Sequence, residues 1–127
     1  MINNLDIKEQ LKNCLKNHNE LSSIPPICYA NEKILEIEKN ILFKKQWICL
    51  GHIKYLKKPG DYFTKLISDI PVIVIRDKSL KIRVFLNVCR HRSAKLLEGE
   101  GNTIGIVCPF HSWAYNLEGK LKGAPNM

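Results

Sequence analysis

Two stretches, NVCRHRSA at residues 87–94 and VCPFHSWAY at residues 107–115, decide how this 127-residue chain folds. Each holds a short mixed pair, Cys89-x-His91 in the first and Cys108-x-x-His111 in the second, with 16 residues between the pairs. Residues two apart on a helix point to different sides, so a Cys-x-His pair fits a loop better than a helix. The two pairs are therefore predicted to lie at the tips of two β-hairpins.

Two thiolates and two imidazoles suit a [2Fe–2S] cluster in which cysteines hold one iron and histidines the other. Neutral imidazoles in place of two thiolates raise the reduction potential of such a cluster by hundreds of millivolts. Backbone N–H groups near Arg90, Arg92 and Ser112 are expected to reach the sulfurs and tune the potential. The predicted cofactor- and metal-binding residues are Cys89, His91, Cys108 and His111. No catalytic residue is assigned.

Two other uses of these four residues are weaker. Structural zinc is also held by two Cys and two His, but common zinc modules pair Cys with Cys and His with His along the chain. Each short pair here is mixed instead. A nucleophilic Cys–His arrangement would leave the second pair unexplained.

Charge and hydrophobicity exclude several classes of protein. The net charge is +8, and residues 1–60 and 61–127 each hold 10 basic and 6 acidic residues, so no nucleic-acid patch is predicted. No apolar run approaches the ~20 residues of a membrane span, and residues 1–9 lack the form of a signal peptide. A cytoplasmic protein without a membrane or nucleic-acid partner is predicted.

The remaining cysteines and histidines show no ligand spacing. Cys14, Cys28 and Cys49 are scattered in apolar or loop settings and are predicted to be reduced thiols, because no export signal precedes them. His18 and His52 are predicted to be surface or partly buried histidines.

Hydrophobic spacing predicts helices first and strands afterwards. Leu5, Ile7, Leu11, Cys14 and Leu15 predict an amphipathic helix of about four turns, which residues 22–26 end with their paired prolines. A second helix is expected from the N-cap Asn31 to about Lys45, with a packing face formed by Ile34, Ile37, Ile41 and Leu42.

Short strands are predicted from residue 47 onward, at 47–54, 71–76, 82–88, 104–107 and 113–115. Turns are predicted at 57–61, 77–79 and 117–120. The fold class is mainly β with N-terminal helices, an antiparallel β-sheet fold that carries the cluster at two hairpin loops.

The residues around the four ligands resemble a Rieske [2Fe–2S] domain. The respiratory-complex type of that family carries one more cysteine in each loop, and the two form a disulfide. Ala94 and Phe110 stand at those positions here, so the resemblance implies the lower-potential type of ferredoxins and ring-hydroxylating oxygenases. Ser93 and Ser112 stand where the family usually has glycine.

The flanking sequence resembles the N-terminal part of the large (alpha) subunit of aromatic-ring-hydroxylating dioxygenases, a group that includes choline- and carnitine-type monooxygenases. The resemblance runs from about residue 25 to the last residue. It rests on FKKQW (43–47), PGDY (59–62), PVIVIRD (71–77) and VFLNVCRHR (84–92).

The resemblance implies an N-terminal helical segment at 1–45 and a Rieske domain at 46–127, truncated at its C-terminal end. A catalytic domain, with a mononuclear Fe(II) held by two His and one carboxylate, is expected only outside this chain. His18 and His52 cannot supply that triad.

The function that this resemblance implies is electron transfer within an oxidoreductase. The cluster would take one electron at a time from a reductase or ferredoxin and pass it to the mononuclear iron of a dioxygenase or monooxygenase. In the family that iron lies in a neighbouring subunit of a trimer, so a homotrimer or hetero-oligomer is expected of the full-length protein. A stand-alone Rieske ferredoxin-like carrier is the alternative.

Overall fold

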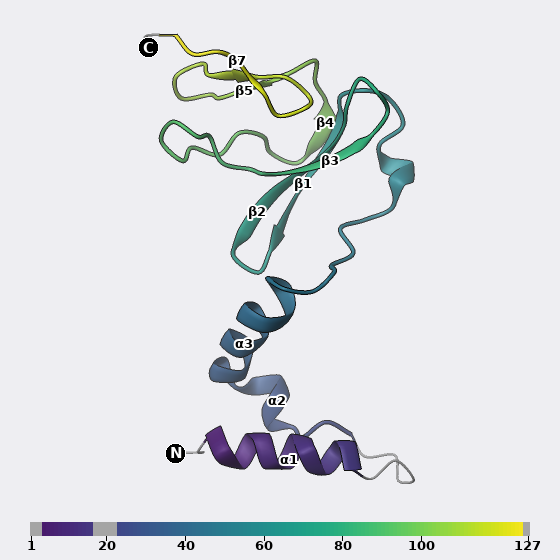
Figure 1. Cartoon of the computed structure of the whole chain (residues 1–127), viewed down its shortest axis with the longest axis vertical. Helices are drawn as coiled ribbons and strands as arrows, with labels where there is room; N and C mark the ends of the chain where they lie inside the picture. Colours follow the sequence, from purple (N-terminus) through teal and green to yellow (C-terminus); the bar gives the residue numbers. More distant parts are fainter. Residues whose placement is uncertain (1–3, 17–22, 126–127) are drawn as a thin grey trace. The chain divides into compact units, whose positions relative to one another are not determined.

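The computed structural model describes residues 4–16 and 23–125, which divide into two compact units between Trp47 and Ile48. The first unit holds the helices α1 (Asn4–Lys16), α2 (Ile27–Ala30) and α3 (Glu32–Glu38), followed by a π-helical turn, η1 (Lys39–Phe43) (Figure 1). Among the helices of the described residues, none has the length and apolar character that a membrane crossing requires.

The second predicted helix begins where its cap residue predicts. The Asn31 side chain accepts a hydrogen bond from the backbone N–H of Lys33 (2.9 Å), which satisfies one free donor of the first turn. Regular α-helix ends at Glu38, and the chain continues to Phe43 as a π-helix.

The short helix α2 was not predicted from the sequence. His18 lies outside the described residues.

The predicted packing face of that helix is wrong for most of its length. Ile34 is buried, whereas Ile37, Ile41 and Leu42 remain about half exposed. Helical spacing identifies which residues share a face, but it does not show that another element covers them.

The second unit contains two antiparallel sheets (Figure 1). The larger has the order β3-β2-β1-β4, with β1 at Asp61–Ile67, β2 at Ile70–Arg76, β3 at Ile82–Leu86 and β4 at Glu100–Asn102. The smaller has the order β5-β6-β7, with β5 at Ile106–Val107, β6 at Ala114–Tyr115 and β7 at Leu121–Gly123. This architecture confirms the predicted fold class.

The strand predictions were correct for the β2–β3 hairpin and for β5 and β6, within two residues at each end. They missed β1, β4 and β7. The strand predicted at 47–54 is wrong: this segment contains a short 3₁₀ helix, η2 (Ile53–Tyr55). The His52 side chain accepts a hydrogen bond from the backbone N–H of Lys54 (3.0 Å), and this local cap favours the turn.

Alternate residues of β2 enter different cores, because successive strand side chains point to opposite faces. Val74 packs with Leu56 and Phe63 on one face. On the other face, Ile73 and Ile75 join a buried cluster that spans both sheets. Its other members are Cys89, Ile106, Cys108, Trp113, Tyr115 and Leu117. Two of the predicted ligands are therefore part of the main core.

Candidate metal centre

The first ligand pair lies in the connection from β3 to β4, which occupy opposite edges of the larger sheet, so the predicted β-hairpin is wrong for this pair. Its loop nevertheless closes like a hairpin tip: the N–H of Cys89 donates to the carbonyl of Ala94 (2.8 Å), and the N–H of Ser93 donates to the carbonyl of Cys89 (3.0 Å). Ser93 makes this turn in the left-handed region, with φ at 55°.

The second ligand pair lies in the loop between the paired strands β5 and β6 and repeats the same closure. The N–H of Cys108 donates to the carbonyl of Trp113 (2.8 Å), and the N–H of Ser112 donates to the carbonyl of Cys108 (3.0 Å). Ser112 has φ at 57°. Glycine adopts this conformation without a Cβ penalty, so both serines carry a backbone cost that glycine would avoid.

The two loops bring the four predicted ligands together, with like beside like. The thiols of Cys89 and Cys108 are 1% and 2% exposed and lie within hydrogen-bonding reach of each other. The imidazole rings of His91 and His111 meet edge to face, with centroids 4.8 Å apart. Sulfur thus pairs with sulfur and nitrogen with nitrogen across the loops, although each loop carries a mixed pair.

This donor set fits a [2Fe–2S] cluster held by two thiolates and two imidazoles. Nδ1 of His111 is buried and has no hydrogen-bond partner. A buried polar atom without a partner is costly, and a bound metal would satisfy it. Within the described part of the chain, no three or more His, Cys, Asp or Glu side chains gather around a site for a single metal ion.

Hydrogen bonds favour the thiolate form of Cys89. Burial raises the pKa of this thiol, but donors outweigh that effect, and the pKa lies below its ordinary value. The donors are the Tyr115 hydroxyl, the N–H of His91, Cys108 and the N–H of Arg92. Of the backbone groups predicted to reach a sulfur, the N–H of Arg92 contributes to this lowering of the Cys89 pKa. The prediction is wrong for the other two: the N–H of Arg90 donates to the Tyr115 hydroxyl, and the N–H of Ser112 donates to the carbonyl of Cys108.

Tyr115 is a buried contact of Cys89 that the sequence did not reveal. Its hydroxyl lies 3.3 Å from Sγ of Cys89 and accepts a hydrogen bond from the N–H of Arg90 (3.2 Å). Because the Arg90 N–H already occupies a lone pair of the phenolic oxygen, the hydroxyl proton is free to point at the sulfur. Burial and the neighbouring Cys89 thiolate raise the pKa of Tyr115, which keeps that proton in place.

The environment of His91 favours its neutral form, which is the form that ligates a metal. Its ring lies against those of Trp113 and His111. This partial desolvation lowers the pKa of His91, and the neighbouring His111 and Arg92 lower it further.

The other predicted residues stay outside this centre. Cys14, Cys28 and Cys49 form no disulfide; the first two are half-buried and Cys49 is exposed. His52 is exposed and caps η2, so its role is structural.

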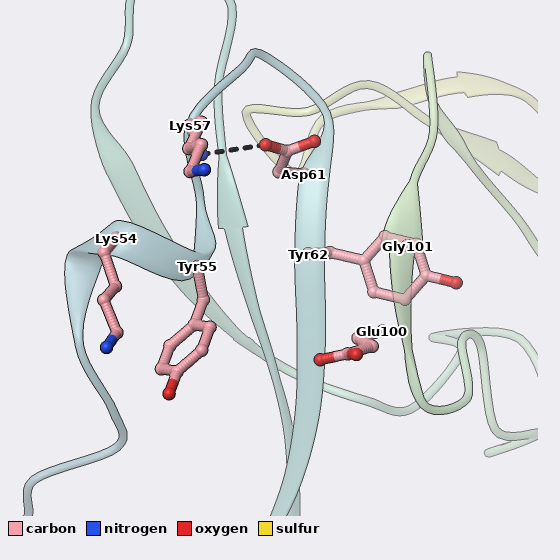
Figure 2. Close-up of a pocket in the computed structure, with 7 residues that line it drawn as sticks. All are labelled: Lys54, Tyr55, Lys57, Asp61, Tyr62, Glu100 and Gly101. Atoms are coloured by element: carbon pink, nitrogen blue, oxygen red, sulfur yellow. Dashed lines mark hydrogen bonds between the residues drawn. The ribbon is translucent and has the colours of Figure 1, made fainter.

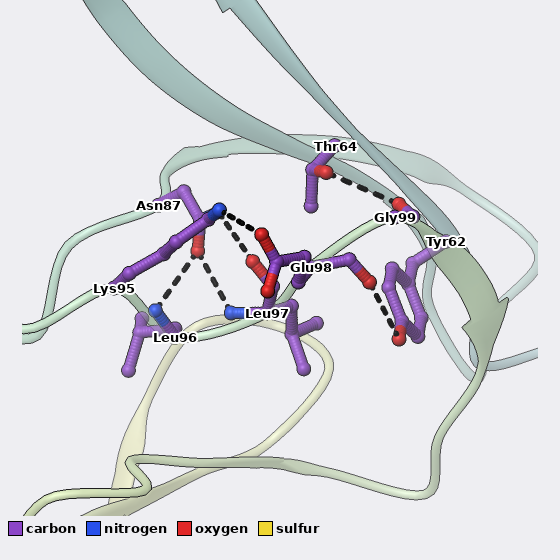
Figure 3. A network of polar contacts seen from close by, with 8 residues as sticks. All are labelled: Tyr62, Thr64, Asn87, Lys95, Leu96, Leu97, Glu98 and Gly99. Atoms are coloured by element: carbon purple, nitrogen blue, oxygen red, sulfur yellow. Dashed lines mark hydrogen bonds and ion pairs between the residues drawn. The ribbon is translucent and has the colours of Figure 1, made fainter.

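Asn87 is a further residue that the spacing did not reveal. Its Oδ1 accepts hydrogen bonds from the N–H groups of Leu96 (3.1 Å) and Leu97 (2.9 Å), and its Nδ2 donates to the carbonyl of Leu97 (2.7 Å) (Figure 3). Two bonds from β1 hold the next residues: the Thr64 hydroxyl donates to the carbonyl of Gly99 (3.1 Å) and the Tyr62 hydroxyl to that of Glu98 (3.4 Å). These contacts anchor the returning half of the first ligand loop.

Replacing Asn87 by alanine is expected to destabilise the chain by ~2–4 kcal/mol, because Asn87 is 2% exposed and the change leaves three backbone groups without partners. Urea denaturation measures this. Asn40→Ala is the control: Asn40 is exposed, its Nδ2 donates to the carbonyl of Glu36 (2.9 Å), and its Oδ1 accepts a hydrogen bond from the exposed Lys44 side chain (2.7 Å). Equal losses of stability in the two variants would show that Asn87 does not anchor the loop.

Two hollows lie on this unit. One, of about 700 Å³, is lined by side chains of η2, β1 and β4 and of Lys57, and none of the four predicted ligands reaches it (Figure 2). There the carboxylate of Asp61 already accepts hydrogen bonds from the N–H groups of Lys57 (2.8 Å) and Lys58 (2.7 Å). The other, of about 780 Å³, borders Cys89 and Tyr115.

The family model of the Rieske [2Fe-2S] domain matches residues 46–127, which include both ligand loops. The chain belongs to this family. A Rieske domain carries a [2Fe–2S] cluster, as the spacing of the ligands predicts.

Relatives of this Rieske chain are oxygenase subunits. The benzene 1,2-dioxygenase subunit alpha of Pseudomonas putida is 40% identical over 103 residues, which are 80% of this chain and 23% of that subunit. The carnitine monooxygenase oxygenase subunit of Escherichia coli (strain K12) is 37% identical over 116 residues, 91% of this chain and 31% of that subunit. The Rieske chain thus spans about a quarter to a third of the length of these curated relatives.

A solved structure extends the likeness to nearly the whole chain. Naphthalene 1,2-dioxygenase from Rhodococcus sp., bound to indole, matches 99% of this Rieske chain and 29% of its own with a TM-score of 0.85 and 31% identity. The predicted resemblance to oxygenase alpha subunits is confirmed, and the stand-alone carrier is not favoured.

Proposed function

We propose that this chain is the electron-transfer part of a Rieske non-haem iron oxygenase. Cys89 and Cys108 would hold one iron of the cluster, and His91 and His111 the other. The observation that carries this assignment is the pairing of two buried thiols and two adjacent imidazoles across loops that share one closure. When bound, the cluster supplies a one-electron carrier.

The residues around the centre suit a carrier of single electrons. Burial of Cys89 and Cys108 excludes water from the sulfur side, while His91 leaves part of its ring exposed at the surface of the unit. The exposed imidazole offers the shorter path for an electron to a partner. The proposal therefore places electron exit and entry on the histidine side of the loops.

The destination and the source of the electron belong to the proposal as well. The relatives named above are dioxygenase and monooxygenase subunits, so a mononuclear Fe(II) in a further domain is the proposed acceptor. A reductase or ferredoxin is the proposed donor. The proposal includes a cytoplasmic location and a homotrimeric or hetero-oligomeric full-length protein.

The test is the metal content and the spectrum of the purified chain. Anaerobic reconstitution with iron and sulfide is expected to give two of each per chain, a red-brown colour, and a rhombic EPR signal after reduction with dithionite. Stoichiometric zinc without sulfide, or a reduced sample without that signal, would refute the assignment.

Replacing Tyr115 by phenylalanine is expected to lower the reduction potential. Reduction adds negative charge to the sulfurs, so the donor bond to Cys89 strengthens and its loss disfavours the reduced form. A difference of ~1 kcal/mol in hydrogen-bond energy corresponds to ~40 mV for one electron. Tyr62→Phe is the matched control, because the Tyr62 hydroxyl bonds to the Glu98 carbonyl instead (Figure 3). Equal potentials in both variants would contradict the prediction.

A further inference from the structure

Two aromatic side chains near the end of the second loop reach the two ligands of the first. Tyr115 contacts Cys89, as described above. The indole ring of Trp113 lies parallel to the imidazole of His91, with ring centroids 4.8 Å apart and an angle of 6° between the planes. Parallel, offset rings at this separation are a favoured arrangement.

Trp113 is held firmly, whereas His91 has few other contacts. Trp113 is 9% exposed, belongs to the main core cluster, and accepts the N–H of Cys108 at its carbonyl (2.8 Å). The side chain of His91 is exposed on its loop and meets His111 only edge to face. An imidazole turns about its Cβ–Cγ bond with a broad preference. Backbone closure of the loop therefore does not fix the plane of this ring.

We propose that Trp113 is a positioning residue that holds the imidazole plane of His91 in the orientation in which the ring ligates iron. The inference rests on the proposed function, since His91 meets iron only if the chain holds the cluster. The stack crosses from one loop to the other. Ala94 and Phe110 supply no disulfide between the loops, and the contacts of Trp113 with His91 and of Tyr115 with Cys89 connect the two loops without a covalent bond.

The second histidine provides an internal comparison. His111 also has an aromatic neighbour, Phe110, at 4.3 Å between centroids and 66° between planes. Phe110 lies in the same loop as His111 and is 65% exposed, so it neither bridges the loops nor confines the ring between buried groups. Loss of the two aromatic rings should therefore have different effects on the two histidines.

The experiment compares Trp113→Phe with Trp113→Met in the iron-loaded chain. Phenylalanine keeps a ring that can stack on His91, and methionine fills space without one. The readouts are the EPR g values and the ¹⁴N couplings of the two ligating imidazoles in the reduced state. Phe110→Met is the matched control, because it removes an aromatic ring from the other histidine and leaves the His91 stack.

Trp113→Phe is expected to keep the wild-type g values and couplings. Trp113→Met is expected to broaden the EPR lines, because the g values spread when the ring of His91 takes several orientations. It is also expected to change one ¹⁴N coupling, that of His91, whereas Phe110→Met is expected to leave that coupling unchanged. Wild-type couplings in loaded Trp113→Met, or altered couplings in Trp113→Phe, would overturn the positioning role alone. A wild-type chain that takes up no iron and sulfide would overturn the proposed function and this inference together.

Discussion

Replacing Cys108 or His111 by alanine is expected to abolish cluster binding, with loss of the visible absorption and of the EPR signal of the reduced protein. In the proposed assignment, each of these side chains is one of two protein ligands of its iron. Replacing a residue that hydrogen-bonds to a metal ligand typically costs ~10–100-fold in metal affinity. Removal of a ligand itself should cost more. Iron and sulfide analysis of the reconstituted variants measures the loss.

Cys49→Ala is the control for that experiment. Cys49 is a free thiol of the same unit, it is exposed, and it lies in neither ligand loop. This variant is expected to bind the same amount of iron and sulfide as the wild type. Full cluster content in Cys108→Ala, or equal loss in Cys49→Ala, would refute the assigned ligand set.

Loss of the cluster should also weaken the fold. A group that binds the folded chain but not the unfolded one stabilises it by mass action. Cys108→Ala is therefore expected to melt at a lower temperature than the loaded wild type. Because Cys108 lies in the main core cluster, loss of its buried sulfur is expected to add a packing cost, so the variant should melt no higher than the unloaded wild type.

The ligands could be predicted from the sequence because their chemistry is local. Cys89-x-His91 and Cys108-x-x-His111 are short pairs, and only a loop lets both members of such a pair face one point. The β2–β3 hairpin was predictable for a similar reason, since two apolar runs flank the polar turn at Asp77. In both cases the deciding residues are neighbours along the chain.

The missed elements depend on partners that are distant in sequence. In β1 the burial does not alternate regularly, and its order comes from pairing with β2 on one side and β4 on the other. The bonds of Asn87 and the stack of Trp113 on His91 are likewise contacts through space. Residue spacing carries no signal for such contacts, although a buried asparagine beside a predicted ligand is a type of residue that often anchors loops.

Replacing Gly60 by alanine is expected to destabilise the chain by ~3–5 kcal/mol. Gly60 has φ at 87°, and an added Cβ would lie 2.1 Å from the carbonyl oxygen of Thr103. That neighbour is backbone and cannot swing aside. Gly60 also donates its N–H to the carbonyl of Arg76 (2.8 Å) and accepts the N–H of Thr103 at its own carbonyl (3.0 Å). A shift of Gly60 would therefore weaken the links between the ends of β2 and β4.

Gly99→Ala separates this clash from the backbone conformation itself. Gly99 has φ at 65°, and nothing lies within 4 Å of the position of an added Cβ. Alanine there should cost only the ~1–2 kcal/mol of a left-handed residue. Urea denaturation of the two variants is measured in the same loaded state. Gly60→Ala is expected to have the lower midpoint, because its free energy of unfolding also loses the cost of the clash with Thr103. Equal midpoints would mean that the chain around Gly60 yields to a Cβ, and that this junction does not hold the sheet that supports the first ligand loop.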